Sequence, residues 1–147
     1  MEIKPFDPAS YNKYDKPAKK VFMAYLKDNG YTEVIENPNK YGIDILATYI
    51  DGSLHKYDVE VKTGWKVKYF NWSTLHIPER KRKFAEPINQ FFVVINEQYQ
   101  YAYVATGAKY LEADSITIDT VNKSEDHFVD IPVKECTLVE LVNYAHV

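Results

Sequence analysis

Apolar and polar residues recur along this chain with two different periods, which predicts a domain of mixed helices and strands. Residues 16–28 have an apolar stripe at helical spacing, formed by Ala18, Val21, Phe22, Tyr25 and Leu26. Pro17 is typical of a first helical turn, and Asn29-Gly30 is typical of a helix end. We therefore expect a helix over 16–28, followed by a short strand over 31–36.

Two extended runs on either side of Asp51-Gly52-Ser53 predict a β-hairpin over residues 43–61. We expect Ile50 to pair with Leu54, because this register gathers the apolar side chains of both strands on one face. A slip by one residue would mix those side chains with charged ones. The hydrophobic pattern therefore favours a three-residue loop.

The rest of the pattern predicts further strands and two more helices. Phe91–Ile95 is a continuous apolar run, typical of a buried central strand. The other expected elements are an irregular segment at 1–15, an extended segment at 65–72, a helix from Pro78 to before Pro87, strands near 99–106, 115–120 and 128–133, and a C-terminal helix starting at Thr137-Leu138-Val139-Glu140, which has capping-box spacing. The fold class is mixed α/β (α+β), with a largely antiparallel entry into the sheet.

Length and composition limit the classes of protein that fit. A length of 147 residues suits one compact domain, so we expect residues 1–147 to form a single domain. The longest apolar run is far shorter than the roughly 20 residues of a membrane span, and the first residues have no apolar stretch typical of a signal peptide. We therefore expect a cytoplasmic (intracellular) protein with no membrane partner. The single cysteine, Cys136, excludes an internal disulfide and a thiolate zinc cluster within one chain.

Three acidic residues and one lysine share one face of the predicted hairpin. The expected register places Asp44 opposite Glu60, and Asp58 and Lys62 flank Glu60 on the same face. Carboxylates at about 5 Å across two strands repel each other, so their charge must be neutralised. A hard divalent cation is one solution, and a hairpin face that is simply polar is the other.

The acid-x-Lys triplet alone is weak evidence, because Glu2-Ile3-Lys4 and Glu79-Arg80-Lys81 have the same spacing. Its context carries more information. Gly42-Ile43-Asp44, a hairpin, and Glu60-Val61-Lys62 together resemble the active-site signature of the PD-(D/E)xK nuclease superfamily, over roughly residues 15–96. This superfamily includes many type II restriction enzymes and the archaeal Holliday-junction resolvases.

The resemblance implies a restriction-endonuclease-like αβββαβ core, with a mixed central sheet flanked by helices and with extra C-terminal strands and a helix. It also implies that Asp44 and Glu60 bind Mg²⁺, which Mn²⁺ can replace, and that the Val61 carbonyl is a further ligand. By the same resemblance, Lys62 orients or activates the attacking water.

Two positions depart from the family pattern. Ile43 stands where the family has a proline before the aspartate. Many members also have a glutamate on the first helix, whereas residues 16–27 contain no acid. Asp15 is either a substitute for it or the N-cap of the helix, and Glu33 and Glu36 are weaker substitutes. Without a substitute, one-metal chemistry is favoured over two-metal chemistry.

Positive charge is concentrated in one tract of the sequence. Residues 62–83 contain 7 basic residues and 1 acidic residue, whereas 84–147 contain 3 and 10. The tract predicts phosphate contacts by Lys66, Lys68, Arg80, Lys81 and Lys83, with His76 as a further candidate. A solvated charged face and a surface histidine without a role are the alternatives. The interleaved aromatic residues either stack on unpaired bases or pack in the core: Trp65, Tyr69, Phe70 and Trp72.

These features lead to the hypothesis of a Mg²⁺-dependent endonuclease that hydrolyses phosphodiester bonds in DNA. Homodimerisation is the simplest way for one domain to cut both strands of a duplex. One alternative is a nuclease-like module that binds nucleic acid or protein without cleavage. Another is a protein-interaction domain whose acidic C-terminal half binds a basic partner. Whether the DNA is duplex, branched or single-stranded stays open at this point.

Overall fold

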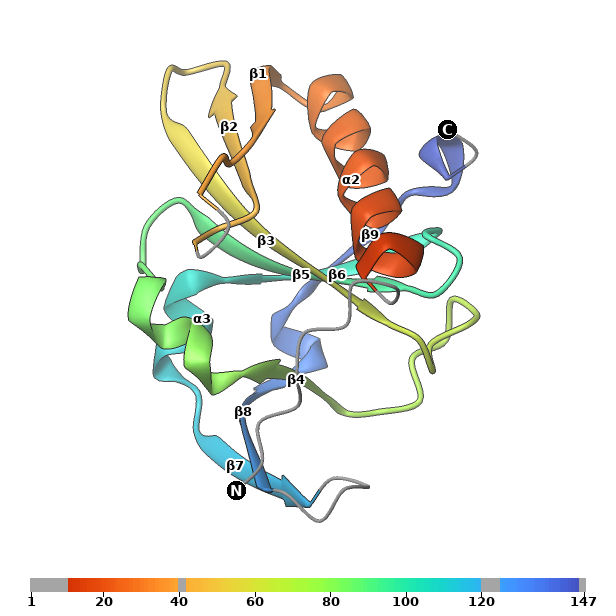
Figure 1. Cartoon of the computed structure of the whole chain (residues 1–147), viewed down its shortest axis with the longest axis vertical. Coiled ribbons are helices and arrows are strands. Elements are labelled where there is room, and N and C mark those ends of the chain that lie inside the picture. The colour runs from red at the N-terminus through yellow and green to blue at the C-terminus, as the bar shows by residue number, and fades with distance from the viewer. Residues whose placement is uncertain (1–10, 40–41, 120–124, 146–147) are drawn as a thin grey trace.

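The computed structural model describes residues 11–39, 42–119 and 125–145, and it contains two β-sheets (Figure 1). A π-helical turn, η1 (Tyr11–Asp15), leads into helix α2 (Lys16–Asp28). The helix has the predicted bounds, and its apolar stripe buries Ala18, Val21, Phe22 and Leu26. Within the described residues, no helix is long and apolar enough to cross a membrane.

The larger sheet has six strands. Their order across the sheet is β1 (Tyr31–Glu36), β2 (Ile45–Tyr49), β3 (Leu54–Lys62), β5 (Gln90–Asn96), β6 (Tyr101–Thr106) and β9 (Thr137–Glu140). Only β3 and β5 run parallel to each other, and the other neighbouring pairs are antiparallel. This mixed sheet confirms the predicted α+β class.

The connection from β3 to β5 contributes to a smaller, three-stranded sheet. It contains β4 (Thr74–Pro78) and the 3-10 helix η2 (Glu79–Phe84), and β4 pairs with β8 (Glu125–Pro132). On its other side, β8 pairs with β7 (Ser115–Asp119), which follows helix α3 (Gly107–Glu112). Two further 3-10 turns are η3 (Val133–Glu135) and η4 (Val142–Tyr144).

The larger sheet separates two hydrophobic cores. On one face α2 covers Ile45, Ala47, Tyr57 and Val59. On the other face the smaller sheet, α3 and the segment after β3 bury a second cluster: Trp65, Phe70, Leu75, Ile77, Phe92, Val94, Tyr110, Val129 and Ile131. Figure 1 shows α2 and the smaller sheet on opposite sides of β3 and β5. The strand β3 therefore has one side-chain face toward each core.

Several sequence predictions differ from the structure. Residues 65–72 contain no strand, and the strand begins later, at Thr74. The predicted C-terminal helix is wrong, because Thr137–Glu140 forms β9 and completes the edge of β6. An edge strand leaves a row of backbone groups unpaired, and this pairing outweighed the local capping signal. Helix α3 was not predicted, and of the predicted irregular segment at 1–15, residues 1–10 lie outside the described residues.

The hairpin forms with a three-residue loop, but its register is shifted by two residues from the predicted one. Ala47 pairs with His55, and the Tyr49 N–H donates to the Ser53 carbonyl at 2.8 Å. The loop is therefore Ile50-Asp51-Gly52, and Gly52 has a positive φ of 89°. A shift by two residues leaves every side chain on its original face, so the hydrophobic pattern could not distinguish the two registers.

Candidate functional site

Strand β3 extends beyond β2 and leaves one of its edges open. The ladder with β2 begins at Ile45, opposite Tyr57, so Asp44 does not lie opposite Glu60 as predicted. Instead the Val59 N–H donates to Asp44 Oδ2 at 2.8 Å. The backbone N–H and C=O of alternate residues in a strand point to the same side. The Val61 carbonyl therefore points to this open edge as well, where the family resemblance places a ligand atom.

Asp44 is held by a lysine of α2. Lys19 Nζ lies 3.3 Å from Asp44 Oδ1 and 3.4 Å from Glu36 Oε1, and its side chain is only 10% exposed. Lys19 turns toward the sheet one position after Ala18, at the border of the buried stripe of the helix. Helix α2 thus contributes the cation of Lys19 to the site. The residue before the helix, Asp15 at the end of η1, lies near the same site and is described below.

A second lysine neutralises the carboxylates of β3. Lys81 of η2 makes a short ion pair with Asp58 Oδ2, and its Nζ also lies 3.4 Å from Glu60 Oε1. The side chains of Lys81 and Asp58 are 10% and 7% exposed, whereas Glu60 is 31% exposed. The predicted role of Lys81 as a surface phosphate contact is therefore wrong in this structure. Its ammonium group is directed inward because the buried carboxylates attract it.

The position of Lys81 is fixed by residues from the C-terminal half. The Tyr110 hydroxyl of α3 donates to the Pro78 carbonyl at 2.7 Å, immediately before η2. Arg82 donates to the Ala113 carbonyl at 2.9 Å. These bonds attach η2 at both sides of Lys81, so the smaller core supports the charge arrangement at β3.

Asp15 joins this group of charges from η1. It occupies the position before α2 but makes no side-chain capping bond, so the N-cap alternative is not what the structure shows. Burial, followed by the charges of Glu60 and Asp44, raises the pKa of Asp15 from its usual 3.8 to about 6. The structure thus brings Asp15 close enough to both predicted metal ligands to be affected by their charges. Glu33 is exposed on β1, and Glu36 contacts Lys19.

Four carboxylates, those of Asp15, Asp44, Asp58 and Glu60, outnumber the lysines that lie among them, Lys19 and Lys81. The pKa values of Asp58 and Lys81 reflect both burial and this surplus of negative charge. Burial, followed by repulsion from Asp44 and Glu60, raises the pKa of Asp58 despite the opposing effect of Lys81. Burial acts to lower the pKa of Lys81, but the charges of Glu60 and Asp58 outweigh it and raise that pKa. Both pKa values are thus shifted upward, as expected where negative charge exceeds positive charge.

Lys62 lies at the end of β3 and faces a different neighbour. Its Nζ sits 4.2 Å from the centroid of the Trp72 ring, a cation–π contact. Among the ion pairs of the described residues, none joins Lys62 to a carboxylate. Lys62 was predicted to offset the charge of Glu60, but in the structure it is Lys81 that pairs with Glu60.

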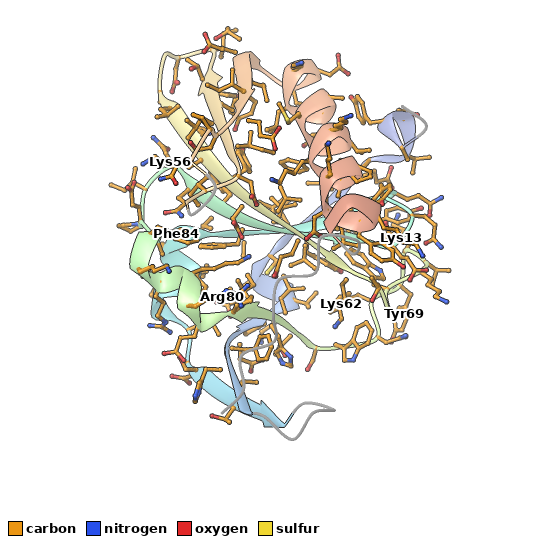
Figure 2. The ribbon with its side chains drawn as sticks, in the orientation of Figure 1. Lys13, Lys56, Lys62, Tyr69, Arg80 and Phe84 are labelled. Atoms are coloured by element: carbon orange, nitrogen blue, oxygen red, sulfur yellow. The ribbon has the colours of Figure 1, made fainter. Side chains whose placement is uncertain are left out.

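The remaining residues of the basic tract divide between two flanks of the molecule. Figure 2 shows Lys62 and Tyr69 on one flank and Arg80 and Phe84 on the other. Lys66 and Lys68 are 67% and 58% exposed, with Glu97 at 4.0 Å and Glu140 at 3.1 Å respectively. On the other flank Arg80 and Lys83 are exposed. His76 is paired with Asp130 at 3.0 Å, and Glu2–Lys4 lies outside the described residues.

The donor chemistry of the site fits a hard cation. Asp15, Asp44 and Glu60 have carboxylate oxygens, and burial, followed by the charges of Glu60 and Asp44, raises the pKa of Asp15. In the part of the chain that the structure describes, no three acidic, histidine or cysteine side chains are grouped closely enough to hold a metal ion. Lys19 and Lys81 instead draw Asp44 and Glu60 toward themselves.

Comparisons with protein-family models, with curated proteins and with solved structures found no match to this chain. Its function must therefore be inferred from the site itself. The sequence identified Asp44, Asp58, Glu60 and Asp15 as candidates, but it gave Lys19 no role. The only signal for Lys19 was its place beside the apolar stripe of a helix.

Proposed function

We propose that this protein is a metal-dependent nuclease that hydrolyses phosphodiester bonds in DNA. The observation that carries the proposal is that Asp44 and Glu60 lie at the end of β3 that β2 leaves unpaired, where the Val59 N–H holds Asp44. The charges of both carboxylates also contribute to the raised pKa of Asp15. These residues come from three separate elements, and the surplus charge they create disfavours folding unless a cation or a proton offsets it. Proteins retain such unfavourable groups mainly at functional sites.

Asp44 and Glu60 would hold Mg²⁺, with Asp15 and the Val61 carbonyl as further ligands at the same edge. When bound, such a cation polarises the scissile phosphate and lowers the pKa of a bound water. The fixed position of Asp44, which Val59 and Lys19 hold on its two oxygens, orients one side of this site. Binding at Glu60 requires its 3.4 Å contact with Lys81 to loosen.

Lys62 and the lysine cluster have different tasks in this proposal. Lys62 has no carboxylate partner among the described residues, so its ammonium group is available to stabilise negative charge that develops on the phosphate. Lys81 keeps Asp58 and Glu60 in place from the inside. The carboxylates around Lys19 and Lys81, which include Glu36, leave negative charge in excess, and a divalent cation would offset part of it.

Plasmid nicking with Mg²⁺, with Mn²⁺ and with EDTA tests the proposal. We expect cleavage only with a divalent cation, and we expect Asp44→Ala and Glu60→Ala each to lower the rate by about 10²-fold or more. Glu79→Ala is the matched control, because Glu79 begins an acid-x-Lys triplet but its carboxylate, unlike Asp58 and Glu60, is in none of the ion pairs of Lys81.

The alternative is a module that binds nucleic acid without cutting it, and the occupation of Asp58 and Glu60 by Lys81 favours it. Absence of metal-dependent cleavage in the wild-type protein, combined with retained DNA binding, would establish the alternative and reject the nuclease.

A further inference from the structure

The segment between β3 and β4 carries exposed aromatic and cationic side chains directly beside Lys62. Trp72 is 40% exposed, Tyr69 is 74% exposed and Val67 is 63% exposed. Large apolar side chains on a surface usually have a partner when they cluster. Figure 2 shows Tyr69 and Lys62 on the same flank, opposite Arg80.

The other two aromatic residues of the segment anchor it. Trp65 is 1% exposed and stacks on Tyr103 at a centroid distance of 5.4 Å. Phe70 is 7% exposed and contacts the edge of Trp65 at 5.1 Å. The backbone N–H of Trp65 also donates to the Lys62 carbonyl at 3.1 Å, which ties the segment to the end of β3. Of the two predicted alternatives for the aromatic residues, core packing therefore applies to Trp65 and Phe70. Base stacking stays a prediction for the exposed Tyr69 and Trp72.

The ring of Trp72 is supported on several sides but not covered. It contacts Phe70 at a centroid distance of 5.0 Å, and Lys62 Nζ lies 4.2 Å from its centroid. A Cβ at Gly64 would be 3.6 Å from its Cη2 atom. A ring that is held in place in this way loses little conformational freedom when a flat ligand stacks on it. Trp72 is therefore pre-organised for such a ligand.

The charges of the segment indicate the chemistry of that ligand. Lys62 lies over the Trp72 ring, and Lys66 and Lys68 precede Tyr69 in the same segment and form surface pairs with Glu97 and Glu140. Such pairs contribute about 0–1 kcal/mol and are readily displaced by a stronger anion. Exposed aromatic rings next to cations suit single-stranded DNA, whose unpaired bases can stack on the rings while its phosphates contact the cations. In a duplex the base faces are already stacked on one another and are not accessible to a side-chain ring.

We propose that residues 66–72, called here the aromatic platform, bind single-stranded DNA, with an unpaired base stacked on Trp72 and the adjoining phosphate at Lys62. The proposal deepens and rests on the proposed function, because Lys62, which contacts Trp72, lies on β3 two residues after Glu60. It gives the substrate a single-stranded region beside the bond that is cut.

Tryptophan fluorescence tests the platform, because the chain has only two tryptophans and Trp65 is buried. A short oligothymidylate is titrated in EDTA, so no cleavage occurs, and a hairpin duplex of equal length is the comparison. We expect the oligothymidylate to quench Trp72 emission and the duplex to quench it far less. The variant Trp72→Phe retains only Trp65, so its quenching should disappear.

Affinity provides a second measurement. Trp72→Ala should weaken oligothymidylate binding by about tenfold, as measured by the anisotropy of a labelled strand. Tyr69→Ala removes a side chain that is mostly in solvent, so it keeps the test valid if Trp72→Ala fails to fold. Ile50 lies on the hairpin loop and is 71% exposed, close to the 74% of Tyr69. The control variant Ile50→Ala should therefore bind as the wild type does.

Equal affinity for the two DNA forms, or wild-type binding by Tyr69→Ala and Trp72→Ala, would overturn the platform. A change of oligomeric state in Tyr69→Ala without a change in DNA affinity would overturn it as well, because it would assign the surface to a second copy. Metal-dependent cleavage that persists in those cases would leave the proposed nuclease intact. Conversely, quenching by oligothymidylate in a protein that never cuts DNA would keep the platform and reject the nuclease.

Discussion

The two ends of the basic tract use their lysines in opposite ways. Lys62 and its neighbours 66–72 lie in an open segment, where cations alternate with exposed rings. Lys81, in contrast, sits in a buried environment and neutralises Asp58 and Glu60. The tract is uniform in the sequence, yet one end faces solvent and the other completes a charge cluster. A local excess of charge therefore does not show whether a lysine binds an external anion or an internal one.

The largest effect on stability is expected at Lys81. Lys81→Met leaves two carboxylates near each other with little solvent, and breaking a buried ion pair costs about 3–5 kcal/mol. Lys62→Met removes only a partly exposed cation–π contact and should cost about 1 kcal/mol or less. Urea unfolding of both variants at pH 7 measures the difference. Equal destabilisation of the two variants would contradict the prediction that the buried Lys81 contributes more to stability than Lys62.

The largest effect on activity is expected at Lys62. If it stabilises charge on the phosphate, Lys62→Met should lower the cleavage rate by about 10²-fold, or about 3 kcal/mol in the barrier, with little change in stability. Single-turnover cleavage measured beside unfolding curves tests this separation. A rate near that of the wild type would assign the catalytic lysine to another position, with Lys81 the first to test.

Asp15 tests whether the site has surplus negative charge. Its pKa is raised from 3.8 to about 6, so the folded protein binds its proton more tightly than the unfolded chain does. The contribution of Asp15 to stability is therefore complete below pH 3.8 and is lost as the pH rises to about 6. Asp15→Asn should stabilise the metal-free protein at pH 7 by about 1 kcal/mol, after allowance for solvent screening.

Asp51 provides a control of opposite sign. Hydrogen bonds from the Ser53 side chain and backbone lower the pKa of Asp51, so its contribution is present at neutral pH and is lost in acid. Thermal melting of Asp15→Asn and Asp51→Asn between pH 3 and 8 compares them. Stability of Asp15→Asn equal to or below that of the wild type at pH 7 would contradict the surplus of charge.

The smallest effect is expected for the exposed cations of η2. Reversing the charges of Arg80 and Lys83 together should weaken duplex DNA binding at all sequences. The slope of log affinity against log salt should also decrease by roughly 0.9 for each phosphate that the variant no longer neutralises. Filter binding at several salt concentrations measures the slope. An unchanged slope would identify this flank as a solvated surface.

The sequence predicted those parts of the fold that depend on local periodicity. The helix over 16–28, the strand over 31–36 and the central strand around Phe91–Ile95 all form where the pattern placed them. Errors arose where the outcome depends on a distant partner. Thr137–Glu140 is a strand because β6 needs an edge partner, although its spacing favours a helix start.

The hairpin shows the same limit within the candidate site. Its two faces were assigned correctly, because a side-chain face repeats every two residues and hydrophobic burial selects it. The register was wrong by two residues, since burial is the same in both cases. Asp44 therefore lies beside the Val59 N–H, in a gap beyond the end of β2, and not opposite Glu60.

The sequence by itself determined which residues carry the negative charge of the site and which face of β3 presents Asp58, Glu60 and Lys62, because both follow from residue type and from the strand period. The tertiary structure alone decided what balances that charge. Lys19 and Lys81 come from a helix and from a crossover segment that hydrogen bonds to α3 and its following residues hold in place. Coulomb attraction acts through space and strengthens with burial, so its partners are selected by folded proximity and not by spacing along the chain.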